Sequence, residues 1–177
     1  MNTLEVVKVE NPKGGDPGRH AFAMPEGNDS WYFLLFNASK KSVTVNLKEP
    51  AGVELVKQMA GAADVMIENF SPRVVDQLGL GSETLLGVNR DLVVVRMPAF
   101  GLGGPWRDRV GFAQTIEQAV GLAFLTGYTD EAPLIPNGMC DPLAGVFGAI
   151  AALTGLAERS QTGAGVVIES PMVGAGL

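Results

Sequence analysis

The segment from Gly138 to Gly165 constrains the fold of this chain most, because a long and almost uncharged helical pattern follows a single acidic residue. Between Pro142 and Ala157, apolar side chains recur at steps of three and four residues, which predicts a helix with one buried apolar face. That face consists of Leu143, Val146, Phe147, Ile150, Leu153 and Ala157. Pro142 suits the first helical position, so the pattern makes Asp141 the N-cap and places its carboxylate where the helix dipole favours the ionised form. Such an anchored carboxylate either only caps the helix or serves as a nucleophile, and spacing alone favours the cap.

The composition fits one compact domain, because 46% of the 177 residues are hydrophobic and 18% are charged. A net charge of −6 and a pI near 4.8 exclude nonspecific binding to nucleic acid or to an anionic membrane. The single Cys140 and single His20 exclude a disulfide framework and a zinc site of the His/Cys type, so no metal is expected and cytoplasmic residence fits best. The uncharged run from Pro142 is shorter than a bilayer needs and is interrupted by glycines, so we interpret it as a core helix.

The rest of the chain alternates short strands with helices. Strands are predicted at residues 4–9, 42–46, 65–68, 92–97 and 166–169, and helices at 50–60 (with Leu55, Val56 and Met59 inward), 72–78, 82–88 (capped by Ser82) and 112–126. Loops are predicted at 98–110 and 127–139. This alternation predicts an α/β fold of the Rossmann-like type, a parallel sheet with covering helices. No linker marks a second domain.

The first strand ends in an acidic residue, Glu10, and this position is unusual. In a doubly wound sheet such a strand is ordinarily the second one, with a glycine-rich phosphate turn about 20 residues before it. Only three residues precede Leu4 here. Either this likeness is accidental, or the chain lacks the first strand and helix of its own fold.

Several short blocks occur in the order that is found in the class III CoA-transferase family. They are Val7-Lys8-Val9-Glu10, Gly14-Gly15-Asp16-Pro17, Asn37 with Lys40-Lys41-Ser42-Val43, Asn46-Leu47-Lys48, Ala63-Asp64-Val65 with Glu68-Asn69-Phe70, Leu78-Gly79-Leu80, Phe100-Gly101 with Gly104-Pro105, Cys140-Asp141-Pro142-Leu143-Ala144-Gly145 and Thr162-Gly163. The chain therefore resembles this family, which includes formyl-CoA transferase, carnitine CoA-transferase and the α-methylacyl-CoA racemases. Family members begin with an additional strand–helix unit and continue well past residue 177. The resemblance thus implies a single partial domain over residues 1–177, which lacks the first strand–helix unit and the C-terminal part.

The resemblance also implies a reaction and its residues. Asp141 falls on the family's nucleophilic aspartate, which attacks an acyl-CoA thioester and then carries CoA as an aspartyl thioester. Asn69 and Phe70 match a pair beside the CoA adenosine. A second CoA-contact segment is matched by Val45, Asn46, Leu47 and Lys48. The CoA phosphates would meet a cluster drawn from Lys40, Lys41, Lys48, Arg73 and either Arg107 or Arg109. The expected partners are an acyl-CoA and a carboxylic acid acceptor, with no prosthetic group, and the family implies a homodimer.

Three alternatives stay open at this point. A racemase is disfavoured, because Phe112 stands where the racemases have a histidine, one of two bases they need. A non-catalytic remnant or dimerising module would keep the fold without the reaction, and the isolated chain is expected to be weakly active or inactive. Cys140 is either a thiol nucleophile or a small buried residue, and the second is favoured because no histidine is near it in the sequence.

Overall fold

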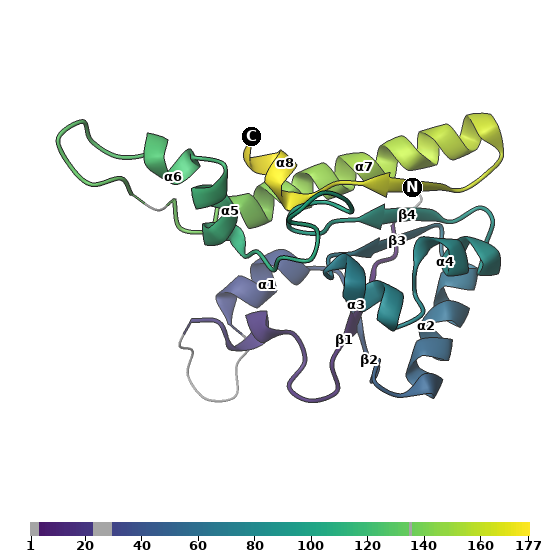
Figure 1. Cartoon of the computed structure of the whole chain (residues 1–177). Helices are drawn as coiled ribbons and strands as arrows, with labels where there is room; N and C mark the ends of the chain where they lie inside the picture. Colours follow the sequence, from purple (N-terminus) through teal and green to yellow (C-terminus); the bar gives the residue numbers. More distant parts are fainter. Residues whose placement is uncertain (1–3, 23–29, 135) are drawn as a thin grey trace. The chain divides into compact units, whose positions relative to one another are not determined.

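The computed structural model describes residues 4–22, 30–134 and 136–177. The contacts between residues divide the chain into two compact units, Met1–Val56 and Lys57–Leu177, and each unit is described by itself (Figure 1). Parallel strands with helices occur in both units, so the α/β fold class is confirmed. The assignment of residues 1–177 to one partial domain remains a prediction.

The first unit is built on a pair of parallel strands, β1 (Val7–Glu10) and β2 (Lys41–Thr44). Between them lie a short 3-10 helix, η1 (Pro17–His20), and α1 (Trp31–Asn37), neither of which was expected. Helix α2 (Pro50–Ala62) begins in this unit and ends in the second one. Within α2, Val56 is buried as expected, whereas Leu55 is 43% exposed and the expectation for it is wrong.

A buried carboxylate at the end of β1 organises the first unit. Glu10 accepts hydrogen bonds from Arg19 Nε and Nη2 at 2.9 Å each, from Ser42 Oγ at 2.7 Å and from the Asp16 amide at 2.8 Å. The Arg19 hydrogen bonds dominate, and together these donors lower the pKa of Glu10 to about 2 despite its burial. The acidic end of β1 therefore ties the loop after this strand to β2.

The second unit contains a parallel sheet with the strand order β3-β4-β5, formed by β3 (Val65–Glu68), β4 (Val93–Arg96) and β5 (Val166–Glu169). Its helices are α3 (Pro72–Gln77), α4 (Ser82–Val88), α5 (Ala113–Ala119), α6 (Leu122–Leu125), α7 (Cys140–Thr162) and α8 (Met172–Gly176). All four residues of the central strand β4 are buried, as expected for a strand covered on both faces.

Two helix predictions in this unit need correction. The single helix expected over residues 112–126 is divided into α5 and α6 at Gly121, whose φ of 82° lies in the left-handed region that interrupts a helix. Gly81, and not Ser82, is the N-cap of α4.

Helix α7 buries a different face from the expected one. Its buried residues are all small: Cys140, Ala144, Gly148, Ala151 and Gly155. The large apolar residues Val146, Phe147, Ile150 and Leu153 are 47–63% exposed. The reason is the close approach of α7 to the sheet, along which it runs in Figure 1: a Cβ atom on Gly155 would lie 2.4 Å from Val93 Cγ1, and one on Gly148 would lie 2.5 Å from Met97 Sδ. Large side chains would hold the helix too far from β4 and β5.

Helix α7 is also longer than expected, with 23 residues. By length and composition it is the one helix among the described residues that is long enough and apolar enough to cross a membrane. It packs against β3, β4 and β5. This packing is the arrangement of a helix that covers a parallel sheet.

Candidate functional site

Three charged residues end the three strands of the second unit. The strand register places Glu68, Arg96 and Glu169 side by side at the carboxyl edge of the sheet. Arg96 Nε donates to Glu68 Oε1 at 2.7 Å, and both side chains are more than nine-tenths buried. Open α/β sheets bind ligands at this edge, so the row lies where a ligand site is expected.

The two carboxylates of this row fix the loops that follow the strands. Glu68 Oε2 accepts the amide of Phe70 at 2.9 Å, and Glu169 Oε1 accepts the amide of Leu102 at 2.7 Å. The first bond orients the turn that carries Asn69 and Phe70. Asn69 is exposed and Phe70 is 42% exposed. Both residues predicted for CoA binding in this unit are therefore accessible, and sequence reasoning missed the Arg96–Glu68 pair that holds them.

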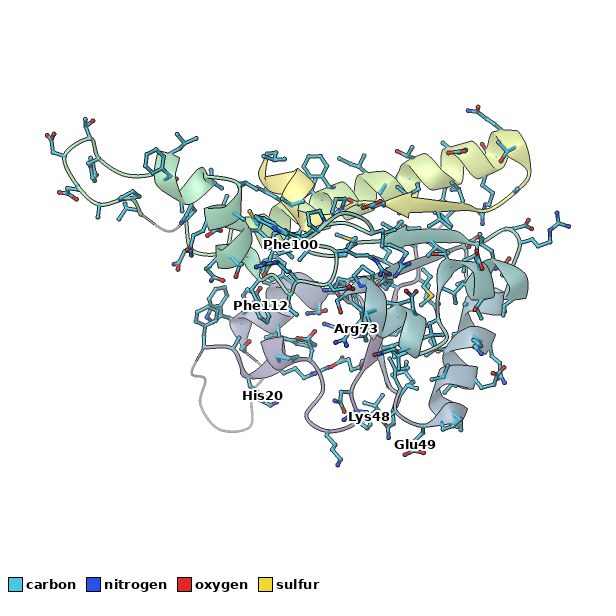
Figure 2. All side chains as sticks on the ribbon, in the orientation of Figure 1. His20, Lys48, Glu49, Arg73, Phe100 and Phe112 are labelled. Carbon is cyan, nitrogen blue, oxygen red and sulfur yellow. The ribbon has the colours of Figure 1, made fainter. Side chains whose placement is uncertain are left out.

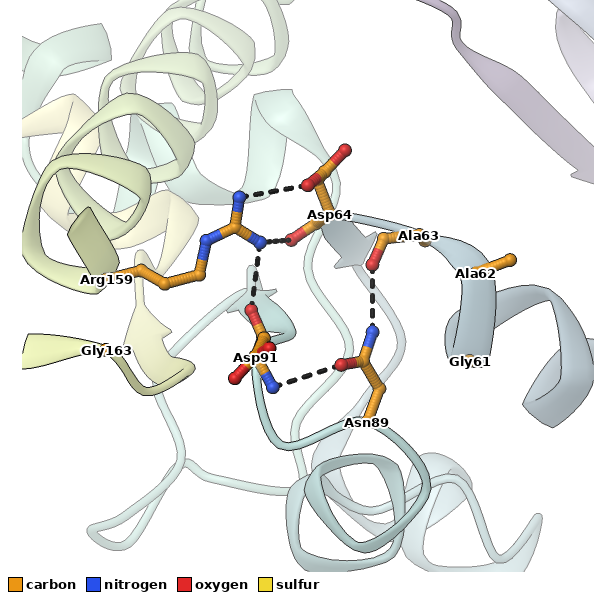
Figure 3. Close-up of a pocket in the computed structure, with 8 residues that line it drawn as sticks. All are labelled: Gly61, Ala62, Ala63, Asp64, Asn89, Asp91, Arg159 and Gly163. Carbon is orange, nitrogen blue, oxygen red and sulfur yellow. Dashed lines mark hydrogen bonds and ion pairs between the residues drawn. The ribbon is translucent and has the colours of Figure 1, made fainter.

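The direction of α7 places Asp141 at the same edge. Near the C-terminus of the helix, Arg159 donates to the Asp64 carboxylate at 2.9 Å and to the Asp91 carbonyl at 3.0 Å (Figure 3). Asp64 and Asp91 precede β3 and β4, so this end of α7 lies at the amino edge of the sheet. Gly148 contacts Met97, the residue after β4. The seven residues from Asp141 to Gly148 correspond to about 10 Å of helix, which extends past the carboxyl edge.

The geometry at Asp141 differs from the prediction in two respects. Helix α7 begins at Cys140 with Met139 as the N-cap, so Asp141 lies in the first turn and does not cap the helix. The pKa of Asp141 is raised and not lowered, because its carboxyl is partly desolvated and because Glu117 lies near it. Asp141 is nevertheless exposed, so its carboxylate is accessible to a ligand.

A buried carboxyl group on α5 was not predicted. Glu117 is 0% exposed, and its Oε1 accepts the amide of Gly138 at 2.9 Å. Its Oε2 is buried and has no hydrogen-bond partner among the described residues. Glu117 also helps burial to raise the pKa of Cys140, which is 0% exposed. The interpretation of Cys140 as a small buried residue is thus confirmed.

The second CoA-contact segment follows β2 in the first unit. Asn46 and Lys48 are exposed, Leu47 is half-buried and Val45 is 5% exposed. The Asn46 carboxamide accepts the amide of Lys48 at 3.1 Å, which forms a tight turn at the carboxyl end of the β1–β2 pair. Val45 donates its amide to the Glu10 carbonyl at 2.9 Å. This segment presents Lys48 (labelled in Figure 2) to solvent, whereas the Val45 side chain is not available for a contact.

The expected phosphate cations fall in both units and have different surroundings. Arg107 pairs with Asp76 at 3.0 Å, Lys41 pairs with Glu5 at 2.9 Å, and the Arg109 guanidinium lies 5.5 Å from the centre of the Trp106 ring. Lys40 and Arg73 are exposed. The structure describes the cations of each unit separately, so the cluster remains a prediction.

Two further observations bear on the alternatives. Phe112, where the racemases carry a base, is 70% exposed and offers no ionisable group, while His20 contacts the carbonyl of Gly14 within the first unit. The described residues include no group of three or more His, Cys, Asp or Glu side chains that could hold a metal ion.

A shallow cavity of about 430 Å³ lies at the amino edge of the sheet (Figure 3). It is lined by Gly61, Ala62, Ala63, Asp64, Asn89, Asp91, Arg159 and Gly163. Asn89 donates to the carbonyls of Ala60 and Ala63 at 3.0 Å each, and Arg159 bridges Asp64 and Asp91. These polar groups are hydrogen-bonded to one another and not directed at a ligand, so we interpret the cavity as a gap between packed loops.

The sheet, its covering helices and a carboxylate beside the carboxyl edge define a protein of the α/β class, in which ligands ordinarily bind at that edge. Residues 5–177 match the model of CoA-transferase family III, and the chain belongs to this family. It is 38% identical over 170 residues to a succinyl-CoA–D-citramalate CoA-transferase of Chloroflexus aurantiacus, covering 93% of this chain and 41% of that protein. It is 35% identical over 170 residues to the beta subunit of a succinyl-CoA–L-malate CoA-transferase of the same species, covering 95% and 42%.

A solved structure supports the fold independently. The crystal structure of a CaiB/BaiF family protein from Brucella suis superposes with a TM-score of 0.88 at 34% identity, over 97% of this chain and 46% of that one. The chain thus spans less than half the length of these relatives. The resemblance found in the sequence is confirmed at the level of the family and its fold.

Proposed function

We propose that this chain forms the nucleophile-bearing part of a CoA-transferase that moves CoA from an acyl-CoA to a carboxylic acid through Asp141. The observation that carries the proposal is the exposed Asp141 carboxylate in the first turn of α7, beyond the carboxyl edge of the sheet. The two relatives from Chloroflexus support succinyl-CoA as the first donor to test, with a dicarboxylic acid as acceptor.

The proposed reaction needs no net transfer of protons or electrons. The Asp141 carboxylate attacks the thioester carbonyl, the carbon–sulfur bond breaks, and CoA leaves as a thiolate, while the acyl group and Asp141 are joined in a mixed anhydride. The thiolate then attacks the aspartyl carbonyl, which releases the donor acid and gives an aspartyl-CoA thioester. The acceptor carboxylate attacks this thioester, the carbon–sulfur bond breaks, and the CoA thiolate is freed while a new mixed anhydride forms. The thiolate then attacks the carbonyl carbon of the acceptor in this anhydride, which releases the new acyl-CoA and the Asp141 carboxylate. Each difficult exchange is divided into easier covalent steps.

We assign CoA binding to Asn69 and Phe70 in the second unit and to Asn46, Leu47, Lys48 and the backbone of Val45 in the first. Phe70 offers a half-exposed aromatic ring on which an adenine can stack, and the amide of Phe70 is already held by Glu68. Lys48 is exposed beside a tight turn and offers a cation to a phosphate. The chain would need no prosthetic group, since CoA enters and leaves as substrate.

A trapping experiment on the full-length protein tests the nucleophile. Hydroxylamine added during turnover with succinyl-CoA should convert Asp141 to a hydroxamate, which peptide mass spectrometry locates. Asp141→Ala and Asp141→Asn should lose several orders of magnitude in kcat, because no other group replaces the nucleophile. Asp130→Asn removes an exposed carboxylate from the same unit and should keep wild-type activity. Undiminished transfer by Asp141→Ala would end the proposal.

The alternative of a dimerising module has one observation in its favour. The large apolar residues of α7 are exposed, as Phe124 and Leu125 of α6 are, at 78% and 81%. A surface of this kind favours association, and we propose that the protein works as a homodimer. Sizing chromatography paired with calorimetric titration of CoA separates the two functions: association with CoA binding supports the transferase, and association without it supports the module. Cytoplasmic residence remains our proposal, in keeping with a lone, buried cysteine.

A further inference from the structure

Glu117 is a buried carboxyl group with only one of its two oxygens hydrogen-bonded. Its Oε1 accepts one amide proton, from Gly138, while its Oε2 is buried without a partner among the described residues. Burying a polar atom without a partner costs free energy. Its neighbour Ile116 packs with Ala113 and Cys140 in a buried apolar cluster. The position of Glu117 is therefore unfavourable for a carboxyl group unless that group has a further role.

The hydrogen bond of Glu117 acts on the turn that starts α7. Gly138 has a φ of 98°, and its carbonyl accepts the amide of Asp141 at 3.3 Å. The Gly138 amide therefore donates to Glu117, and the Gly138 carbonyl accepts from Asp141. A Cβ atom built on Gly138 would lie 3.8 Å from Ala113 Cβ, so α5 and the turn are in contact. The chain of bonds from Glu117 through Gly138 to Asp141 fixes where the first turn of α7 begins.

Glu117 is also the titratable group that acts on Asp141. The other charged residues on the elements packed against α7 are Glu68 of β3, Arg96 of β4 and Glu169 of β5, while α8 carries no titratable side chain. Glu158 and Arg159 lie on α7 itself, in its last two turns. Among the described residues only Glu117 acts with desolvation to raise the pKa of Asp141.

We propose that Glu117 is a positioning residue for Asp141, which fixes the start of α7 through the Gly138 amide and holds a second carboxyl group beside the nucleophile. The inference rests on the proposed function. A carboxylate next to another carboxyl group is more basic, and a more basic carboxylate is a better nucleophile toward a thioester. The same arrangement moves the protonation of Asp141 to higher pH, so the acid limb of the pH–rate profile should lie higher than it would for an isolated aspartate.

Two substitutions in the full-length protein separate the two roles. Glu117→Gln keeps an oxygen for the Gly138 amide and removes the acid, so the acid limb of kcat should move to lower pH while KM for succinyl-CoA stays unchanged. Glu117→Met removes both the bond and the acid, and a displaced nucleophile should cost about 100-fold in kcat. Glu131→Gln is the matched control, because it removes an exposed carboxylate of the same unit and should leave the profile unchanged.

A direct titration gives a readout that does not depend on activity. In carbon-13 NMR spectra, the titration midpoint of the Asp141 carboxyl should fall in Glu117→Gln and stay in place in Glu131→Gln. An unchanged midpoint together with an unchanged acid limb in Glu117→Gln would overturn the inference, even if Glu117→Met fails to fold.

Hydroxylamine trapping on the wild type distinguishes a failure of this inference from a failure of the proposed function. If Asp141 is trapped and Glu117→Gln behaves like the wild type, only the inference fails; if Asp141 is never trapped, the proposed function fails and the inference falls with it.

Discussion

Helix α7 packs closely against the sheet of the second unit, and Gly155→Ala measures what this contact contributes. A Cβ atom at this position would lie 2.4 Å from Val93 Cγ1, 3.0 Å from Ile168 Cδ1 and 3.2 Å from Val166 Cγ1. Val93 is 0% exposed, and its β-branched side chain is stiff at χ1. The backbone of the helix or of β4 must therefore shift. Overpacking of this kind costs about 1–3 kcal/mol.

Two other glycines of the same helix supply the controls. All three substitutions gain the same helix propensity, about 1 kcal/mol for Gly→Ala, so the differences between them report packing alone. Gly145 has nothing within 4 Å of the new methyl group, and Gly145→Ala should stabilise the protein by about 1 kcal/mol. A methyl group on Gly148 meets the sulfur of Met97 at 2.5 Å, and this flexible side chain can move. We expect Gly148→Ala to lie between the other two.

The assay is urea unfolding followed by far-ultraviolet circular dichroism, with the three variants compared at equal m-values. Gly155→Ala should be less stable than Gly145→Ala by about 1–3 kcal/mol, which is the overpacking cost alone. Equal midpoints for these two variants would refute the reasoning that the small face of α7 is in tight contact with β4 and β5.

Three further predictions follow from the buried ionisable groups. The folded-state pKa of Glu10 is lowered from 4.5 to about 2, so the stability it contributes is present above pH 4.5 and is lost as the pH falls toward 2; urea midpoints measured across this range should change less in Glu10→Gln. The pKa of the Cys140 thiol is raised by burial, then by Glu117 and Asp141, so its reaction with a thiol reagent at pH 8 should be at least about tenfold slower in folded than in unfolded protein, and equal rates would contradict its burial. Arg96→Met leaves the buried Glu68 carboxylate without its cation and should cost about 3–5 kcal/mol, part of which the added Glu68→Gln change should restore; additive effects would show that the pair does not interact.

The sequence carried enough information for the elements with strong local signals. Strands β3 and β5 and helix α4 have the predicted bounds, because runs rich in valine and isoleucine or an apolar periodic segment end at turn residues. Helix α1 was missed because its seven residues make only two turns, too few for a periodic pattern to be recognised. The break at Gly121 was missed because an isolated glycine in a helical pattern is also compatible with a continuous helix.

The candidate site was predicted in part for a similar reason. Asp141 stands at the beginning of a long apolar segment, and this local signal pointed to it. Glu117 has no local signal, since a single glutamate in a short helix is ordinarily solvated. Its burial depends on the contact between α5 and the turn before α7, which are far apart in the sequence. The Arg96–Glu68 pair was missed because the register of β3 and β4 brings these residues together, 28 positions apart.

The choice of the buried face of α7 shows where hydrophobicity is an incomplete guide. Large residues and small residues recur with the same helical period on different sides of this helix, so periodicity alone cannot decide between them. The small face is the one that packs against the parallel strands β4 and β5. Gly148 and Gly155 let the helix come so close that an added methyl group would overlap with Met97 or Val93. That close approach determines how far Asp141 lies from the carboxyl edge of the sheet. It also leaves Phe147 and Ile150 exposed, and a homodimer in which they are covered would use both faces of the helix, one for packing against the sheet and one for association.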